Sequence, residues 1–374
     1  MTSGTRWYQR GNMNVQITPV VHGASSAGRN STAVRALRVT INEVAAHADV
    51  SRQTVSNTLN YPDRVRPATL QRVRESIDLL GYRPSAPSQQ LRRQRSGAVG
   101  FELNALGSAL NDVAHPFLVA LSVATAQYGC HLVPFASGDA RPALDGYIDT
   151  VQRHLVDAFV IVDTHPMDPR PAWLSQRAIP WVAFGRVWDD ETLTNWADVD
   201  GRAGTAAAVD HLVERGYERI GYLGWPVGSA VGDDRRDGWA TATARRGIDA
   251  APEAVCEQDI AEATAAAGPL LDCVGRGGAV VCASDLLAVG VLHAALARGW
   301  HIGPDLGLVG FDGSGTAQMC GITTLVQPLE RIADHCLKVV HDLLDGAPAP
   351  ASGSLFQPQL FTRTSTDRTK KGFS

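Results

Sequence analysis

The sequence has few of the features that mark membrane, secreted or metal-binding proteins. No run of 18 apolar residues occurs among its 374 residues, so no segment predicts a membrane-spanning helix. The N-terminus lacks the short apolar core of a secretory signal peptide. The six cysteines lie far apart and form no C-x-x-C pair and no metal-ligand spacing. This pattern favours buried, reduced thiols in a cytoplasmic protein without a bound metal.

Sequence motifs of common enzymes are also missing. The chain has no G-x-G-x-x-G after a predicted strand, no P-loop, no H-E-x-x-H and no G-x-S-x-G, so we expect neither an enzyme nor a cofactor. A content of 44% hydrophobic and 19% charged residues is typical of a globular protein. The length indicates two or three domains.

Lysine is absent from residues 1–97, and the charge of this part differs from that of the rest. It holds 14 Arg against five acidic residues, a formal charge of +9, whereas the remainder holds 20 basic and 33 acidic residues, a charge of −13. A basic N-terminal part on an acidic body is expected when only the N-terminal part contacts phosphate. Residues 1–38, which hold five of these arginines and no acid, predict a disordered basic arm.

Residues 39–61 predict a helix-turn-helix. Apolar residues recur at i, i+3, i+4 and i+7, which is one face of a first helix: Ile41, Val44, Ala45 and Ala48. A third helix is predicted over Thr69–Leu80, and Gly81 has the position of a residue that ends a helix. Three short helices form a small core.

The second helix of this pattern has a polar outer face. Ser51 can cap its N-terminus, and Val55 and Leu59 are predicted to face inward. The outward residues are hydrogen-bonding types that suit contacts with base edges and phosphates: Arg52, Gln53, Ser56, Asn57 and Asn60. From the pattern alone, a solvated helical hairpin remains the alternative.

These residues resemble the LacI/GalR (lactose-repressor) family of bacterial transcription regulators. The similarity follows T-I-N-E-V-A, V-S-R-Q-T-V-S-N-T-L-N, R-V-R-P-A-T and G-Y-R-P in order, with Q-Q-L-R behind. The resemblance implies that Arg52 and Gln53 contact bases and that Asn57 lies one turn further on. It also implies phosphate contacts by Thr40, Ser51, Thr54 and Asn60. Asp49 stands where the family usually has Gly, so we expect a positive φ there.

The resemblance divides the N-terminal part into a DNA-binding domain over residues 39–83 and a hinge over residues 84–97. In the family the hinge folds as a short helix only on operator DNA, and a leucine enters the minor groove; Leu91 has that position here. Pro87 is tolerated in a first helical turn, so we expect the hinge helix to begin at about Ser85. A flexible basic linker is the alternative interpretation.

Residues 98–366 alternate predicted strands and helices, which indicates parallel, doubly wound sheets. Strands are predicted at Ala98–Leu103, His131–Phe135, Ala158–Val162, Trp181–Phe184, Arg219–Leu223, Ala279–Ala283 and Leu306–Phe311. Helices between them include Phe117–Tyr128, Ala203–Glu214 and Leu286–Arg298. A closing strand is predicted over Leu355–Thr366, and residues 367–374 are predicted to be a flexible tail.

Further motifs extend the resemblance across this body. They are H-P-F, I-P-W-V-A-F-G-R, V-D-G-R-A-G, H-L-V-E-R-G-Y-E-R-I-G-Y-L-G, A-S-D-L-L-A-V-G, G-L-V-G-F-D and T-T-L-V-Q-P. The resemblance implies two subdomains of periplasmic-binding-protein type with an effector cleft between them. No leucine heptads follow the last predicted strand, so we expect a homodimer rather than a tetramer.

Effector-binding residues are expected at the carboxyl ends of strands. The resemblance implies that Arg235, in an R-x-x-G-aromatic motif, donates to the effector and that Asp285 accepts from its hydroxyls. Four more residues have neighbouring family positions: Phe117, Arg186, Asp200 and Gln327. An Asp or Arg at a strand end can instead be a cap or an ion pair.

The family often places an aromatic residue in a crossover loop, where it stacks on the effector. The segment 258–260 has that place here, so Ile260 would replace the aromatic residue. Trp188, Trp196 and Trp225 are predicted in strand-end loops, and one of them could supply the stacking surface for a sugar. A sugar or glycoside is therefore the expected effector, and a purine is the main alternative.

The sequence thus predicts a repressor that binds a palindromic operator as a homodimer and responds to a small molecule. Whether the effector releases DNA or tightens its binding is not decided by the sequence. A sugar receptor or an enzyme without DNA function is the alternative from another class, and neither would need residues 39–93.

Overall fold

The structure is a computed structural model that describes residues 39–82, 95–103, 113–136, 144–248 and 252–369. The predicted basic arm over residues 1–38 and the hinge positions Ser85, Pro87 and Leu91 lie outside the described residues, as does most of the predicted tail. The chain divides into two compact units, residues 1–92 and 93–374, which are described separately here as the head and the body.

The head is a bundle of three helices, as predicted. They are α2 (Ile41–His47), α3 (Arg52–Asn60) and α4 (Pro67–Leu80), with a short 3-10 turn at Pro62–Arg64 between the last two. The core is small and is formed by Val44, Ala45, Ala48, Val55 and Val73. Asp49 has φ 48°, which confirms the expected positive φ, and Gly81, with φ 62°, ends α4 as predicted.

The body contains two six-stranded sheets. The first holds β1 (Ala98–Glu102), β2 (His131–Phe135), β3 (Ala158–Val162), β4 (Trp181–Phe184), β5 (Trp196–Val199) and β11 (Ser354–Phe356). The second holds β6 (Ile220–Gly224), β7 (Glu253–Val255), β8 (Gly278–Cys282), β9 (Leu306–Asp312), β10 (Thr323–Val326) and β12 (Gln359–Phe361). Every pair is parallel except β10 with β12.

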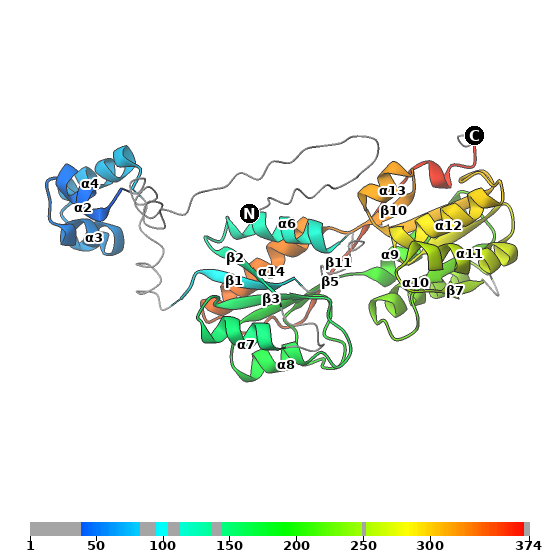
Figure 1. Cartoon of the computed structure of the whole chain (residues 1–374), viewed down its shortest axis with the longest axis horizontal. Coiled ribbons are helices and arrows are strands. Elements are labelled where there is room, and N and C mark those ends of the chain that lie inside the picture. Colours follow the sequence, from blue (N-terminus) through cyan, green and yellow to red (C-terminus); the bar gives the residue numbers. More distant parts are fainter. Residues whose placement is uncertain (1–38, 83–94, 104–112, 137–143, 249–251, 370–374) are drawn as a thin grey trace, which may run out of the picture. The chain divides into compact units, whose positions relative to one another are not determined.

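Each sheet has its own helices and forms one lobe. In the first lobe, α6 (Ala114–Thr125) and α14 (Leu329–Leu344) cover one face of the sheet, and α7 (Asp145–Gln152) and α8 (Pro169–Gln176) cover the other (Figure 1). The second lobe contains α9 (Gly201–Glu214), α10 (Val231–Arg245), α11 (Ile260–Val274), α12 (Asp285–Ala297) and α13 (Gly315–Met319).

The chain passes between the lobes three times. It leaves β5 for α9, returns from β10 to α14, and passes again from β11 to β12. The strand order of both sheets is that of a doubly wound α/β fold. After β10 of the second lobe, the chain returns to the first lobe for α14 and β11 and ends in the second lobe with β12. Because all strands but β12 run parallel within their sheets, the carboxyl ends of several strands meet at one edge of each sheet.

The predicted strands agree with the observed ones to within one residue at each end. Three strands were not predicted: β5, β7 and β10, each of three or four residues. The closing strand within Leu355–Thr366 was wrong as a single element, because Pro358 separates β11 in the first lobe from β12 in the second. The predicted helix Phe117–Tyr128 begins three residues earlier, at Ala114, with Pro116 in its first turn.

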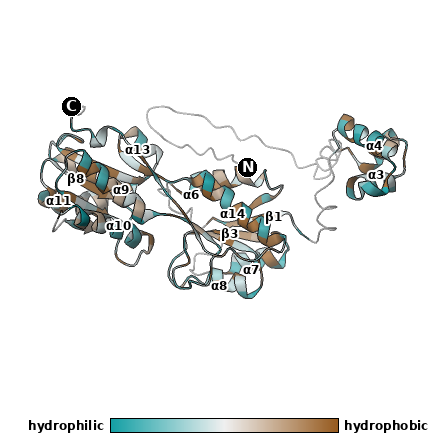
Figure 2. Ribbon diagram, turned by 180° about the vertical axis from the view of Figure 1, so that it is seen from behind, coloured by the Kyte–Doolittle hydropathy of each residue, from teal (hydrophilic) through white to brown (hydrophobic). Residues whose placement is uncertain are grey.

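The core of the body is apolar in both lobes. Figure 2 shows hydrophobic residues gathered around β3 in the first lobe and β8 in the second. Cys256, Cys282 and Cys336 are buried there, as predicted, but Cys273 on α11 and Cys320, which follows α13, are exposed. The prediction of buried thiols was therefore wrong for these two. Within the described ranges, no helix combines the length and apolar character needed to cross a bilayer.

Candidate DNA-binding surface and effector site

The outer face of α3 presents the polar side chains of the head. Arg52 and Gln53 are exposed in its first turn, and Asn57 is half-buried one turn further on. Gln53 Nε2 donates to Asn57 Oδ1 at 3.0 Å, so the two amides are already aligned along the helix. Asn60 is exposed and its Nδ2 donates to the backbone oxygen of Ser56. This face offers an arginine fork and an amide, the groups that read guanine and adenine.

Two capping hydroxyls lie at the helix N-termini of the head. Thr40 Oγ1 accepts from Glu43 N at 3.3 Å, while the Glu43 carboxylate accepts from Thr40 N at 2.5 Å. Ser51 Oγ accepts from Thr54 N at 3.1 Å and lies 2.9 Å from Thr54 Oγ1. Both hydroxyls are exposed at a helix N-terminus, which is where a helix attracts phosphate.

Two predictions about α3 were wrong. Ser56 was predicted to face outward but is only 9% exposed, and Leu59 was predicted to face inward but is 36% exposed. Thr58 is buried instead, at i+3 from Val55. Positions i+3 and i+4 lie on nearly the same side of a helix, so apolar spacing alone did not distinguish them.

In the second lobe, a polar cluster lies at the carboxyl ends of β9 and β10. Arg235 on α10 is 5% exposed, and its Nη1 lies 3.4 Å from Asp312 Oδ1 and donates to the backbone oxygen of Ala283 at 2.5 Å. Gln327 Nε2 donates to the same Asp312 oxygen at 2.7 Å. Asp312 has φ 117°, an unusual conformation for a residue other than glycine. We call Arg235, Asp312 and Gln327 the polar cluster.

Aromatic rings pack against the guanidinium of Arg235. Its Cζ lies 3.7 Å from the ring centre of Phe311 and 5.3 Å from that of Trp225. The indole of Trp225 is fixed by Gln258, whose Oε1 accepts from Trp225 Nε1 at 2.7 Å. Arg235 Nε is buried without a hydrogen-bond partner among the described residues. A buried donor of this kind suits a ligand acceptor.

Arg186 extends from the end of β4 in the first lobe to the second lobe. Its Nε lies 3.2 Å from Asp198 Oδ2, and its Nη2 donates to Asp234 Oδ2, on α10 of the second lobe, at 2.9 Å. The guanidinium also lies over the Trp188 ring, at 5.0 Å from its centre. Trp188 Nε1 is buried and has no partner in the described part of the chain. Arg186 therefore joins the two lobes next to an indole with an unused donor.

Asp198 has an unusual protonation equilibrium. Burial raises the pKa of this carboxyl to about 6, although Arg186 and Arg235 act against the rise, and the nearby Asp234 adds to it. Because the folded pKa lies above the ordinary value of 3.8, folding favours the protonated form, and this carboxyl lowers the unfolding free energy as the pH rises from about 4 to about 6.

The variant Asp198→Asn should lack this contribution. We expect the difference in unfolding free energy between variant and wild type to change by up to about 3 kcal/mol between pH 4 and pH 7, in the direction that favours the variant at pH 7. Urea denaturation at both values measures it. A difference independent of pH would contradict the raised pKa.

Asp285, the predicted hydrogen-bond acceptor for the effector, is fully buried at the start of α12. Its Oδ2 accepts from Ser314 N at 2.7 Å and its Oδ1 from Thr324 Oγ1 at 2.5 Å. The carboxylate thus joins α12 to the N-terminus of α13 and to β10. In this structure the side chain has no exposed surface, so a contact with an effector would require a rearrangement, and its role as an effector ligand stays a prediction.

Two other predicted effector contacts, Phe117 and Asp200, pack or hydrogen-bond within the protein itself. Phe117 is fully buried in the core of the first lobe, with its ring centre 4.5 Å from that of Phe184. Asp200 caps α9, where it accepts from Ala203 N at 2.9 Å, and it also accepts from Gln357 Nε2 at 2.7 Å. Asp200 and Gln357 belong to two of the three interlobe passages, so their bond ties these passages together.

The candidates for a stacking surface are separated by the structure. Ile260 is the first residue of α11 and packs against the core of the second lobe, so the segment 258–260 is not one of the crossovers between the lobes. Trp196 is the first residue of β5 rather than part of a loop, and a Cβ at Gly353 would clash with its indole. Trp188 and Trp225 remain half-buried at strand ends.

Three acidic residues of this region were not singled out from the sequence: Asp198, Asp234 and Asp312. Asp312 had a usable signal, since it ends the motif G-L-V-G-F-D and therefore follows a buried strand. Asp234 and Asp198 had none, because their pairing with Arg186 depends on the fold: Asp198 meets it from β5 of the same lobe and Asp234 from α10 of the other lobe.

Comparisons with known proteins agree with this architecture. Residues 40–85 match the family described as bacterial regulatory proteins, lacI family, and residues 209–366 match a periplasmic binding protein-like domain. The first match corresponds to the head. The second covers most of the second lobe, together with α14 and β11 of the first lobe.

Several relatives match along most of the chain. An HTH-type transcriptional regulator from the aml 5' region of Streptomyces limosus is 30% identical over 87% of this chain and 93% of its own length. The HTH-type transcriptional regulator CelR of Thermobifida fusca is 29% identical over 88% of this chain and 99% of its own. A solved CelR–cellobiose complex is similar with a TM-score of 0.65 at 26% identity, covering 88% of this chain and all of that one.

A helix-turn-helix head and a two-lobed, periplasmic-binding-protein-like body are the parts of a DNA-binding transcription regulator. The chain belongs to the LacI family of bacterial transcriptional regulators.

Proposed function

We propose that this regulator is a homodimeric repressor that binds a palindromic operator and is controlled by a neutral sugar or glycoside. The observation that carries the proposal is that one chain contains both the exposed Arg52–Gln53 face on the head and the buried polar cluster in the body. Such a protein acts in the cytoplasm, where it meets DNA.

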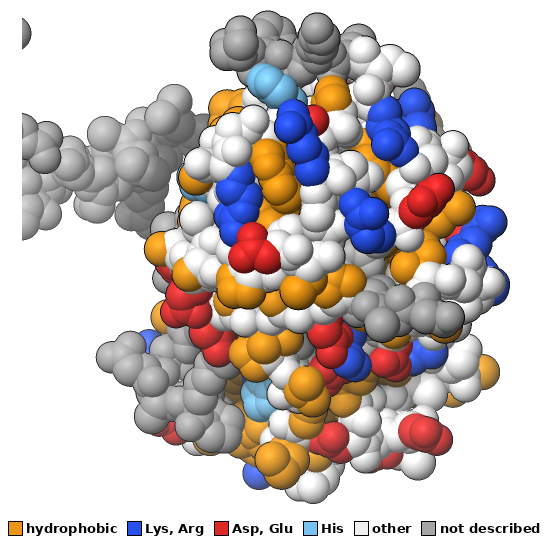
Figure 3. All heavy atoms as spheres, turned by 90° about the vertical axis from the view of Figure 1, so that its right-hand side faces the viewer, with side chains coloured by type: hydrophobic (Ala, Val, Ile, Leu, Met, Phe, Trp, Pro, Cys, Tyr) orange, Lys and Arg blue, Asp and Glu red, His pale blue; other side chains and the backbone are white. Residues whose placement is uncertain are grey.

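Charge supports DNA binding by the head rather than by the body. Residues 1–97 carry a formal charge of +9, whereas the rest of the chain carries −13. The end of the body seen in Figure 3 has basic and acidic side chains interspersed, without a continuous basic patch on the visible face. Phosphate attraction is therefore concentrated in the part of the chain that carries α3.

The composition of the effector site supports a neutral, hydroxyl-rich ligand. Arg186 and Arg235 are balanced by Asp198, Asp234 and Asp312, so the site has no excess positive charge for a phosphate or a carboxylate. Unpaired donors on Arg235 and Trp188 can meet hydroxyl oxygens, and Asp312 can accept from hydroxyls. The half-buried indoles offer surfaces for the apolar face of a sugar ring.

Allosteric control follows if the effector prefers one arrangement of the lobes. Arg186 already holds Asp234 across the lobes, so an effector that competes for Arg186 or adds to this contact would change the relative stability of open and closed bodies. In a dimer, such a change alters the spacing of the two heads and hence the affinity for a palindrome.

Electrophoretic mobility shifts on fragments of the protein's own genomic neighbourhood test the proposal. We expect a specific complex at moderate salt and a change in its affinity on addition of one neutral sugar. A response to purines but not to sugars would favour the purine alternative, and no complex with any fragment would contradict the DNA-binding role.

The variant Arg52→Ala tests base reading by α3. We expect the operator affinity to fall by about 1–3 kcal/mol and the preference at one base position to relax, because a bidentate arginine contact to guanine is lost. Binding to a panel of single-base operator variants measures both effects. An equal loss on every sequence would mean that Arg52 contacts only phosphate. The exposed Arg72 on α4 offers a matched arginine control.

The dimer is expected to involve α6. Val119 and Val123 lie one turn apart on this helix and are 63% and 64% exposed, which is unusual for large apolar side chains. The double variant Val119→Glu, Val123→Glu should therefore be monomeric in analytical ultracentrifugation and bind the palindrome at least tenfold more weakly, because two linked heads bind more tightly than one. A dimeric double variant would place the interface elsewhere.

A further inference from the structure

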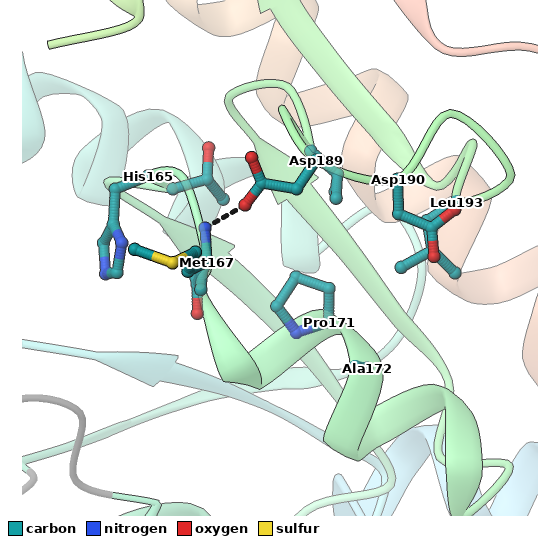
Figure 4. Close-up of a pocket in the computed structure, with 10 residues that line it drawn as sticks. His165, Met167, Pro171, Ala172, Asp189, Asp190 and Leu193 are labelled. Atoms are coloured by element: carbon teal, nitrogen blue, oxygen red, sulfur yellow. Dashed lines mark hydrogen bonds between the residues drawn. The ribbon is translucent and has the colours of Figure 1, made fainter. Parts of the chain in front are cut away.

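A pocket of about 190 Å³ lies within the first lobe (Figure 4). It is formed by the loop after β3, the N-terminal part of α8 and the loop after β4. Its lining is Thr164, His165, Met167, Asp168, Pro171, Ala172, Val187, Asp189, Asp190 and Leu193. All of these residues belong to one lobe, so the pocket does not depend on how the two lobes are arranged.

The polar side chains of the lining are mainly hydrogen-bond acceptors. Among the ten lining residues, the polar or charged side chains are those of Thr164, His165, Asp168, Asp189 and Asp190. The Nδ1 of His165 lies 2.9 Å from the carbonyl oxygen of Pro166. Because a carbonyl oxygen can only accept, Nδ1 carries the proton and Nε2 of the neutral ring is an acceptor. A ligand of this pocket should therefore supply the donors.

Two of the aspartates bring negative charge to the pocket. Asp189 accepts from the backbone N–H of Met167 through one carboxylate oxygen (Figure 4). Asp190 accepts through one oxygen from both the hydroxyl and the N–H of Thr192, and these bonds lower the pKa of Asp190. Neither carboxylate pairs with a basic side chain in the part of the chain that the structure describes. Each therefore retains a second oxygen that can accept from a positively charged donor.

The third aspartate belongs to a buried ion network. Asp168 lies 2.7 Å from Arg170, which also lies 2.9 Å from Glu102, and all three side chains are at most 13% exposed. Arg170 Nη2 donates to the backbone oxygen of Val162 at 2.9 Å, so the network fixes the start of α8 against the end of β3. With two carboxylates for one guanidinium, the network does not offset the charge of the other two aspartates.

A buried hydroxyl in the lining has no hydrogen-bond partner. Thr164 is 8% exposed, and its Oγ1 makes no hydrogen bond with the described residues. The oxygen lies against Gly185, where φ is 122° and where a Cβ would be only 2.4 Å away from it. A buried polar group without a partner costs stability unless a ligand or a water satisfies it. This observation is independent of the carboxylates and points to the same kind of ligand group, a donor.

The remainder of the lining is apolar and sets the size of the ligand. It consists of Met167, Pro171, Ala172, Val187 and Leu193. An apolar cavity of about 150 Å³ can bind benzene, so a pocket of this volume accommodates one ring or a short chain with a small substituent. The nearby carboxylates repel a phosphate or a carboxylate and attract a cation. An apolar body that carries a positively charged donor is an organic ammonium ion.

We propose that this pocket is a binding site for a small organic ammonium ion. The hydrocarbon part packs on Pro171, Val187 and Leu193, and the ammonium group lies beside the carboxylates of Asp189 and Asp190. The pocket shares no residue with the polar cluster of Arg235, Asp312 and Gln327. The inference therefore does not depend on the proposed sugar effector.

Isothermal titration of the full-length protein with benzylamine and n-pentylamine tests the ligand class. Benzyl alcohol is the neutral counterpart of benzylamine, with nearly the same size and shape. We expect saturable binding of at least one amine to a single site, at least tenfold tighter than that of benzyl alcohol, and weaker as the salt concentration rises. Absence of binding by both amines would overturn the proposal, and so would an equal affinity for benzyl alcohol.

Two variants with matched controls test the location of the site. Ala172→Phe places a ring in the pocket, and Gln176→Phe is its control, since Gln176 is exposed on the same helix outside the lining. Asp190→Asn removes one charge but keeps an oxygen that can accept from Thr192. Its control is Glu191→Gln, which removes the same charge from an exposed residue of the same loop outside the lining.

We expect Ala172→Phe to weaken the amine by at least tenfold and Asp190→Asn to weaken it by about fivefold, as for a partly exposed ion pair. Both controls should bind the amine as the wild type does. Wild-type affinity of Ala172→Phe would overturn the location of the site. An unchanged affinity of Asp190→Asn, or an equal loss in Glu191→Gln, would overturn the ion pair, because the acidic surface as a whole would then attract the amine. Circular dichroism of each variant checks that the fold is retained.

Discussion

The variant Asp312→Asn is expected to lose most of its response to the effector while it keeps its affinity for operator DNA. Asp312 ends β9 and meets both Arg235 and Gln327, so it is the carboxylate of the second lobe that can accept from an effector hydroxyl. An asparagine keeps the size of the side chain but removes the charge. A hydrogen bond to a charged group contributes about 1.5–3 kcal/mol, so the effector affinity should fall by about 10- to 100-fold.

Titration calorimetry with the responsive sugar and mobility shifts without it separate the two effects. Asp272→Asn is a matched control, because Asp272 is an exposed carboxylate on α11 that likewise pairs with an arginine, Arg298, at 3.0 Å. Normal sugar affinity of Asp312→Asn would remove Asp312 from the site. A loss of DNA affinity without sugar would mean instead that Asp312 acts on the balance between the lobes.

The long strands of the body could be predicted from the sequence, because each is a continuous apolar run bounded by turns. β3 and β8 are buried along their whole length, and such strands were located to within a residue. β7 and β11 have exposed residues at alternate or middle positions and only three residues each, so they carry little periodic signal. The division of these strands into two lobes was predicted from the family motifs, because periodicity does not show which strands share a sheet.

The residues of the effector site were harder to predict from the sequence than the strands, as Asp285 and Asp312 illustrate. Asp285 follows β8 and Asp312 ends β9, and these two strands pair with each other in the same sheet. The carboxylate of Asp285 is buried and accepts hydrogen bonds from Ser314 and Thr324, whereas the carboxylate of Asp312 lies next to Arg235. The difference depends on the position of a five-residue helix and on a φ of 117° at Asp312, neither of which has a signature in the one-dimensional pattern.

Replacing Asp285 by alanine should therefore affect folding rather than effector binding. The variant leaves the N–H of Ser314 and the hydroxyl of Thr324 without their acceptor in a fully buried place. Each unsatisfied buried donor costs about 1–3 kcal/mol, so we expect the unfolding free energy of the body to fall by roughly 3 kcal/mol. Chemical denaturation followed by circular dichroism measures this loss.

A second substitution separates the loss of the carboxylate from the loss of its contacts. Thr324→Val removes the bond to Asp285 and also the acceptor of Gly313 N, so it should cost more stability in the wild type than in the background of Asp285→Ala, where the first bond is already lost. Folded Asp285→Ala should bind the responsive sugar within about threefold of the wild type, since the side chain is not exposed to a ligand. A stable variant that no longer binds the sugar would reverse this assignment, and Asp285 would then be an effector ligand reached by a movement of α13.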